Sequence, residues 1–178
     1  MGGIDAELVR RVDSLPRVSF AGAGFRHLGP GHSPTSGEGA RIRGGRWNPE
    51  DSFPVLYMAL SPNAVVAEFF RLVERQGMSA ENLLPRRFQE YAVELCELLD
   101  IREEDPRGLL GLTAAIIAGD DSTRCQAVGD AAHYASFEGI LAPSATGAGA
   151  VLAIFTGNLV AGSSIEVGRS HLWTTLPT

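Results

Sequence analysis

The feature that most constrains the fold is a short apolar strand pattern followed at once by a helix pattern. Residues 55–60, VLYMAL, form a continuous apolar run of the length expected for a buried strand. Ser61 and Pro62 then match a helix N-cap followed by proline at the first helical position. Because Gly77 is a typical helix stop, we predict a helix over residues 62–76.

The rest of the chain mixes strand and helix patterns without regular alternation. A short amphipathic helix is predicted over residues 4–14. The further predicted strands are residues 17–28, residues 90–98, residues 139–144 and a run that starts at Val151, and the further predicted helices are residues 107–118 and 122–136. Helices inserted between only some of the strands favour an α+β fold, with a mixed or antiparallel sheet and flanking helices, over a regular βαβ winding.

One long segment has the composition of a surface loop. Residues 29–40 are rich in glycine, serine and proline and cannot bury a core face. Loops of this length in compact domains are often functional, and we interpret this one as a lid over a site.

Composition and charge exclude several classes of protein. The 178 residues, 44% of them hydrophobic, suffice for one buried core, so a single domain is expected. The net charge of −6 gives no general attraction to nucleic acid or to an anionic membrane. No apolar run has the length of a signal peptide or a membrane span, which predicts a soluble, cytoplasmic protein.

The charged and sulfur-containing residues narrow the kinds of site that the chain can build. Lysine is absent, so every fixed cation is an arginine guanidinium, which suits fork-like contacts with carboxylates and phosphates. Cys96 and Cys125 have neither the number nor the spacing of a disulfide framework or a zinc site. We expect both cysteines to be small core residues and expect no metal site.

A glutamate stands out within the predicted helix 62–76. When the helix is drawn at 100° per residue, Glu68 lies beside Leu72 on the shoulder of the apolar stripe. A carboxylate at such a border is partly desolvated and needs a partner or a function. The simpler alternative is an ion pair with Arg71, three positions along the helix.

Three further residues precede Glu68 in the chain. Arg46 follows two glycines in GGRWNP, where the backbone is expected to turn sharply and to present the guanidinium to a cleft. Tyr57 lies inside the apolar strand, and Arg26 lies in an otherwise apolar extended segment. The alternatives are surface arginines and a core tyrosine whose hydroxyl is satisfied.

Together these residue types suggest chemistry on a dinucleotide. A guanidinium can hold a pyrophosphate, and an aromatic ring can stack on a flat ring. A carboxylate can stabilise a ribosyl oxocarbenium ion or bind the ribose hydroxyls. Such a set could cleave the nicotinamide–ribose bond of NAD+, and the amides at the start of the helix 122–136 could supply a second phosphate contact.

Four stretches of the chain resemble the RES-domain family: GEGARIRGGRWNP, LYMALSPNAVVAE, DDSTRCQAVGDAA and GILAPSA. The most specific part is GGRWNP, followed by Tyr57 and by Glu68 eleven positions later. The resemblance runs from about Arg26 to Phe155. We therefore interpret residues 1–178 as one RES-like domain.

This resemblance implies a bacterial toxin whose fold is similar to that of ADP-ribosyltransferase toxins. Family members deplete NAD+ by hydrolysis or by phosphate-dependent cleavage, and at least one branch transfers ADP-ribose to a protein. The implied substrates are NAD+ and, for phosphorolysis, inorganic phosphate. The implied partner is an Xre-like antitoxin that covers the active site, whereas the residues leave open whether the chain forms a homo-oligomer.

The resemblance also assigns roles to the candidate residues. It implies that Arg26 and Arg46 contact the phosphates or ribose, and that Tyr57 contacts the nicotinamide. Glu68 would be the catalytic carboxylate. The family serine has two possible counterparts, Ser144 and Thr123. Ser122, the neighbour of Thr123, would help to bind the substrate.

Two other functions remain open at the level of the sequence. An ADP-ribosyltransferase that modifies a host protein would use the same residues with a different acceptor. A catalytically inactive chain that only binds its antitoxin would keep the fold without turnover. His133 is interpreted as a helix-surface residue and not as a base.

Overall fold

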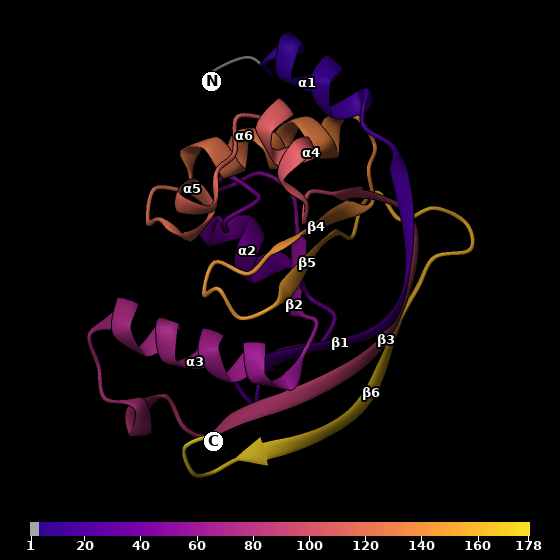
Figure 1. Ribbon diagram of the computed structural model, residues 1–178. Helices are drawn as coiled ribbons and strands as arrows, with labels where there is room; N and C mark the ends of the chain where they lie inside the picture. The colour runs from indigo at the N-terminus through magenta and orange to yellow at the C-terminus, as the bar shows by residue number, and fades with distance from the viewer. Residues whose placement is uncertain (1–3) are drawn as a thin grey trace.

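The computed structural model describes residues 4–178 and shows an α+β arrangement (Figure 1). The strands are β1 (Arg17–Leu28), β2 (Val55–Ala59), β3 (Arg86–Asp100), β4 (Gly139–Pro143), β5 (Ala150–Phe155) and β6 (Ser164–Trp173). The helices are α1 (Ala6–Asp13), α2 (Glu38–Arg43), α3 (Pro62–Gln76), the 3-10 helix η1 (Ala80–Leu83), α4 (Glu104–Leu109), α5 (Ala114–Ala118) and α6 (Thr123–Tyr134).

The strands form one mixed sheet that closes on itself. Their order is β1-β2-β5-β4-β3-β6, and β1 also pairs with β3 along most of its length. Pairing of β3 with β4 is parallel, whereas the other strand pairs are antiparallel. The expected α+β fold with a mixed sheet and flanking helices is confirmed.

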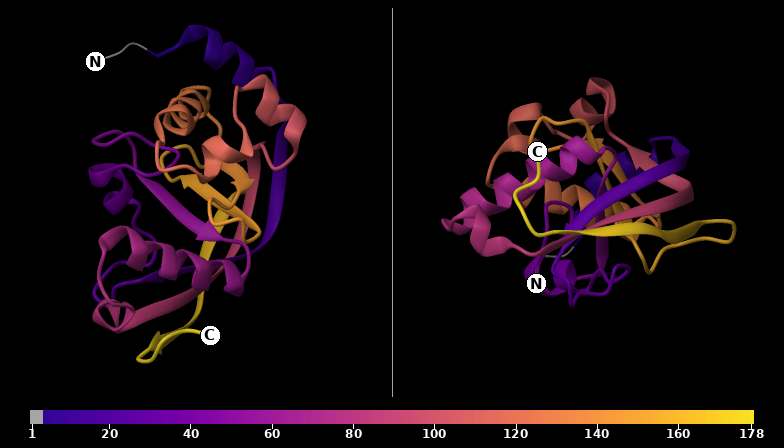
Figure 2. Two further views of the ribbon diagram at one scale, coloured as in Figure 1. Left: turned by 60° about the vertical axis from the view of Figure 1, so that its left-hand side comes forward. Right: turned by 90° about the horizontal axis from the view of Figure 1, so that it is seen from below.

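The helices occupy two regions of the molecule. Helices α1, α4, α5 and α6 gather at one end, and α3 lies at the other end beside β1 and β2 (Figure 1). The left view of Figure 2 also shows the two helical regions apart. The turn between β4 and β5 projects into the space between these two helical regions (Figure 1). A site that uses residues of both regions therefore lies next to this turn.

The α3 helix has the ends that the sequence predicts. The Ser61 side chain accepts a hydrogen bond from the Ala64 N–H at 3.2 Å, and Pro62 occupies the first turn. Gly77 ends the helix with a φ of 62°, in the left-handed region that favours glycine. Burial of Val65 and Phe69 fixes the rotation of α3 and thereby the direction of its other faces.

Three expectations about local structure were wrong. Residues 107–118 do not form one helix, because Gly111 adopts a φ of 68° and Thr113 caps a new helix, α5. Part of the expected loop 29–40 is helical, as α2. Cys96 is exposed and not in the core, because it falls on the outward-facing side of the alternating strand β3, whereas Cys125 is buried as expected.

The strand β6 was not predicted from the sequence. Its residues are mostly exposed, so they form no apolar run. The strand is held instead by antiparallel pairing with β3, from Arg86 opposite Trp173 to Glu94 opposite Ser164. Figure 2 shows β6 at the outside of the molecule, leading to the C terminus.

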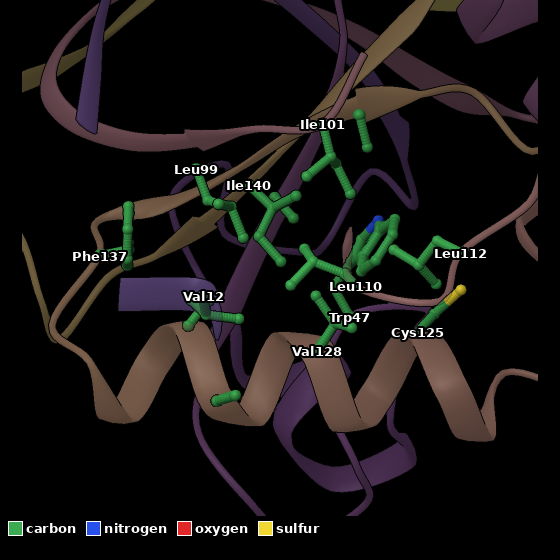
Figure 3. Close-up of a cluster of buried hydrophobic side chains, with 14 of the residues drawn as sticks. Val12, Trp47, Leu99, Ile101, Leu110, Leu112, Cys125, Val128, Phe137 and Ile140 are labelled. Carbon is green, nitrogen blue, oxygen red and sulfur yellow. The ribbon is translucent and has the colours of Figure 1, made fainter. Parts of the chain in front are cut away.

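Trp47 anchors the main core beside α6. The indole is fully buried, and Figure 3 shows it among Leu110, Leu112 and Val128. Helix α6 approaches the backbone of Trp47 so closely that a Cβ at Gly129 would lie 1.8 Å from the Trp47 carbonyl oxygen. Glycine is therefore required at this contact.

We expect the substitution Gly129→Ala to lower the free energy of unfolding by about 1–3 kcal/mol, because the added methyl group must push α6 away from Trp47. Gly108→Ala is the matched control, since Gly108 also lies in a helix and an added Cβ there meets nothing within 4 Å. The control should be neutral or stabilising by about 0.5–1 kcal/mol. Denaturant unfolding of both variants measures the difference, and equal stability would contradict the close contact.

Candidate active site

The segment that carries Arg46 is a tight turn held at both ends. Gly44 has a φ of 71°, and the Gly45 N–H donates to the Asn48 carbonyl at 2.9 Å. A Cβ at Gly45 would lie 2.5 Å from the Tyr57 hydroxyl oxygen. The two glycines before Arg46 thus allow the turn to fold directly against β2.

The hydroxyl of Tyr57 connects this turn to β2. It accepts a hydrogen bond from the Trp47 N–H and donates one to Asn48 Oδ1, each at 2.8 Å. Burial raises the pKa of Tyr57 above its usual value, against the opposing effects of the Trp47 N–H and of the Arg46 charge. The hydroxyl is therefore satisfied within the protein, and contact between the half-buried ring and nicotinamide stays a prediction.

Asn48 completes the same network. Its side chain is fully buried, and its Nδ2 donates to the Ala40 carbonyl at 2.8 Å. This bond ties the turn to α2 as well as to β2. An unpaired buried amide would be costly, so the network specifies one conformation of the turn.

Arg46 projects from the turn, and not all of its guanidinium N–H groups have a partner in the part of the chain that the structure describes. Its Nη2 donates to the Gly119 carbonyl at 2.9 Å. Its Nη1 is buried and has no hydrogen-bond partner among residues 4–178. A buried guanidinium nitrogen without a partner is expected to bind an anion or another acceptor supplied by a ligand.

Glu68 lies half-buried on α3, as its place on the helix shoulder predicts. The ion pair with Arg71 that we considered as the alternative is absent, because Arg71 donates to main-chain carbonyls elsewhere. Burial raises the pKa of Glu68 to about 7, and the positive charge of Arg26 opposes that rise. The carboxyl group thus titrates near neutral pH.

Arg26 and the expected lid are in contact. Arg26 Nη1 donates to the Pro34 carbonyl at 3.3 Å, and the Tyr91 hydroxyl donates to the same carbonyl at 2.7 Å. Arg87 donates to the carbonyl of His32. Residues 29–36 are therefore fastened over this end of β1 and β3, and burial lowers the pKa of Arg26.

The two candidates for the family serine lie in different loops. Ser144 is buried, its Oγ lies 2.8 Å from Thr146 Oγ1, and it accepts a hydrogen bond from the Thr146 N–H at 3.2 Å. Thr123 is exposed at the start of α6, where its N–H donates to Asp121 Oδ1 at 2.9 Å. Ser122, the residue before the helix, makes no side-chain capping bond. These contacts do not select one hydroxyl.

Arg46 and Arg71 bring these segments together. Arg46 donates to the carbonyl of Gly119, and Arg71, on the same helix as Glu68, donates to that of Ala118. Arg71 also donates to the Ala145 carbonyl, next to Ser144. The Arg46 turn and the Glu68 helix therefore both contact the segment that joins α5 to α6, and the Glu68 helix also contacts the loop after Ser144.

Two surface grooves lie away from these residues. Grooves of about 580 and 560 Å³ border the C-terminal segment, and neither is lined by an arginine. Because dinucleotide phosphates need cationic or amide donors, the region around Arg26 and Arg46 is the better candidate for binding them. Within residues 4–178 no group of three or more His, Cys, Asp or Glu side chains is arranged to hold a metal ion.

Sequence reasoning missed Asn48 and Tyr91 and interpreted Arg71 only as a partner of Glu68. The position of Asn48 inside GGRWNP was a usable signal, because a buried amide at a tight turn commonly holds the backbone. His133 is half-buried, and its ring stacks on Phe53 with centroids 3.8 Å apart. This histidine packs against the core and is not a simple surface residue.

No helix in residues 4–178 has the length and apolar character needed to span a membrane.

Comparisons with known proteins agree with this arrangement. The chain is 35% identical over 154 residues to a Mycobacterium tuberculosis protein named NAD(+) phosphorylase MbcT, a match that covers 85% of this chain and 83% of the relative. A second M. tuberculosis protein, described as a probable NAD(+) phosphorylase, is 31% identical over 168 residues and covers 93% of this chain and 78% of the relative.

A solved structure shares the fold almost throughout. The crystal structure of the M. tuberculosis MbcT-MbcA toxin-antitoxin complex matches with a TM-score of 0.87 and 32% identity, over 97% of this chain and 94% of the matched chain. The family model described as the RES domain matches residues 15–176. This chain therefore belongs to the RES domain family.

Proposed function

We propose that this chain is an NAD+ phosphorylase that acts as the toxin of a toxin–antitoxin pair. The observation that carries the proposal is the 35% identity, over 85% of the chain, to a protein named NAD(+) phosphorylase. The buried, unpartnered guanidinium nitrogen of Arg46 and the partly buried carboxyl of Glu68 support the same chemistry, because a guanidinium suits a dinucleotide phosphate and a carboxylate suits a developing cation.

In the proposed reaction, phosphate replaces nicotinamide on the ribose of NAD+. The bond between the nicotinamide nitrogen and the ribose C1 breaks, and its electron pair leaves with nicotinamide. A phosphate oxygen forms the new bond to C1, which yields ADP-ribose carrying a phosphate at that carbon. The transition state carries positive charge on the ribose, so an ionised carboxylate beside it is stabilising.

The candidate residues divide this work. Arg46 offers a buried donor without a partner in the described part of the chain, and we assign it to the pyrophosphate or ribose together with Arg26. Glu68 is assigned to the ribosyl cation and Tyr57 to the nicotinamide ring. The hydroxyl of either Ser144 or Thr123 is assigned to act on the substrate. Ser122, next to Thr123, is assigned to substrate binding.

We also propose a cognate antitoxin as the protein partner. The matched structure is that of a toxin bound to its antitoxin, and it covers 97% of this chain. The family resemblance favours an Xre-like antitoxin. Co-expression with the product of a neighbouring reading frame, followed by copurification, tests this partner.

The decisive experiment is product analysis by mass after incubating the purified chain with NAD+, with and without phosphate. We expect free nicotinamide and phosphorylated ADP-ribose, formed only when phosphate is present. ADP-ribose alone would indicate hydrolysis, and ADP-ribose attached to a lysate protein would indicate a transferase. Unchanged NAD+ would leave only an antitoxin-binding role and overturn the proposal.

We expect Glu68→Gln and Arg46→Met each to lower kcat/KM for NAD+ roughly 10²-fold or more, because each removes charge that the reaction uses. Glu74→Gln and Arg75→Met are the matched controls, since both residues are exposed on the same helix as Glu68. Nicotinamide release measures the rates, and circular dichroism confirms folding. Wild-type rates in both site variants would remove Arg46 and Glu68 from the proposed site.

The pH dependence should follow the ionisation of Glu68. With a pKa of about 7, the carboxyl is protonated at low pH and cannot stabilise a cation. We therefore expect kcat/KM for NAD+ to rise about tenfold per pH unit below pH 7 and to level off above it. The measurement is a pH profile at saturating phosphate.

Phosphate itself ionises in the same range, so the profile needs a control. In Arg26→Met the positive charge that lowers the pKa of Glu68 is lost, and the rising limb should move to higher pH. The ionisation of phosphate is the same in both proteins. If kcat/KM rises over the same pH range in the variant as in the wild type, the ionisation of Glu68 does not determine that rise.

A further inference from the structure

Arg71 links α3 to two loops that are distant in the sequence. Its Nη1 donates to the Ala145 carbonyl at 2.6 Å, and its Nη2 donates to the Ala118 carbonyl at 2.9 Å. Asp120 Oδ1 lies 3.8 Å from Nη2 and is almost fully exposed, so it adds little. The main function of this guanidinium in the fold is therefore to hold two main-chain carbonyls.

Each contact of Arg71 lies next to a candidate site residue. It follows Glu68 by three residues, which places both on neighbouring positions of one helix. Ala145 follows Ser144 directly, and Ala118 is the last residue of α5, shortly before Ser122 and Thr123. One side chain thus connects the Glu68 helix to both candidate hydroxyl loops.

Besides Arg71, Ala148 of the loop 144–149 packs against the cluster that contains Ala64 and Val65 of α3. Helix α3 packs mainly against β1 and β2, whereas α5 and α6 belong to the opposite helical region (Figures 1 and 2). Arg46 donates to the next carbonyl, that of Gly119. The segment after α5 is therefore held by two guanidinium groups, one from the Arg46 turn and one from α3.

We propose that Arg71 is a positioning residue, which fixes the loops 118–123 and 144–149 relative to Glu68 during the NAD+ cleavage proposed above. It does so without contacting the substrate, because its terminal nitrogens face main-chain carbonyls. A shift of about 1 Å in a catalytic group can reduce a rate about 10²-fold, so loss of this link should affect turnover strongly.

The test compares Arg71→Met with Arg75→Met, which removes an exposed guanidinium one turn farther along α3. We expect Arg71→Met to lower kcat about 10–100-fold while KM for NAD+ changes less than about threefold. Arg75→Met should match the wild type. A change confined to KM, or a kcat within about twofold of the control, would overturn the inference.

Two measurements separate positioning from a general loss of structure. Hydrogen exchange should become faster in peptides covering residues 118–123 and 144–149 of Arg71→Met, and stay unchanged in the core strand β5. Arg71→Lys, which keeps one cationic donor group, should fold like the wild type and recover part of kcat. Equal exchange in both loops, or no recovery in a folded Lys variant, would contradict the proposed role.

Double substitutions show which loop Arg71 positions for the reaction. Ser144→Ala and Thr123→Val are each combined with Arg71→Met. The effects on kcat should be non-additive for the hydroxyl that acts on the substrate, because the misplaced loop already lacks its contribution. Full additivity with both hydroxyls would contradict the inference. If the wild type leaves NAD+ intact, the proposed function fails, while hydrogen exchange still tests the link itself.

Discussion

The hydrogen bond from the Tyr57 hydroxyl to Asn48 holds the Arg46 turn against β2, and the candidate site depends on it. The same hydroxyl accepts the Trp47 N–H, and Asn48 continues the network to the Ala40 carbonyl. Because these groups are shielded from water, leaving one of them unpaired would cost more than a single hydrogen bond contributes. The turn therefore has one favourable conformation, and Arg46 has one direction.

Packing around Trp47 gives this turn its second support. The buried indole sits in the core, and α6 contacts its backbone through Gly129, where no side chain would fit. The turn is thus fixed by polar contacts on the β2 side and by close packing on the α6 side. Because the turn is rigid, Arg46 would lose little conformational entropy when it binds a substrate.

Arginine side chains assemble the rest of the site. Three arginines of this lysine-free chain donate to main-chain carbonyls around the candidate site: Arg26 to Pro34, Arg46 to Gly119, and Arg71 to Ala118 and Ala145. A planar group with several donors can bind one loop and still offer nitrogens to an anion. The structural contacts of Arg46 therefore do not exclude its proposed use in binding an anion, and charge counting alone does not locate the site.

Much of the fold followed from local patterns. The strand at 55–59 and the helix α3 are as predicted, because a continuous apolar run, a Ser-Pro cap and a terminal glycine act within a few residues of one another. Strand β6 was not predicted, because it is held by main-chain hydrogen bonds to β3 and its exposed residues form no apolar run. The broken helix at 107–118 depended on the left-handed turn at Gly111, a choice that the apolar residues around it did not reveal.

The residue pattern alone pointed to the family and to three candidate site residues, which are the glycine-flanked Arg46, the strand residue Tyr57 and Glu68 on the helix shoulder. Only the tertiary structure decided how they are held. It assigned the Tyr57 hydroxyl to Asn48 and Trp47, and it turned Arg71 away from Glu68 toward two distant loops. The physical reason is that a side chain's hydrogen-bond partner depends on which backbone groups packing brings within about 3 Å, and those groups here lie up to 74 positions away in the chain.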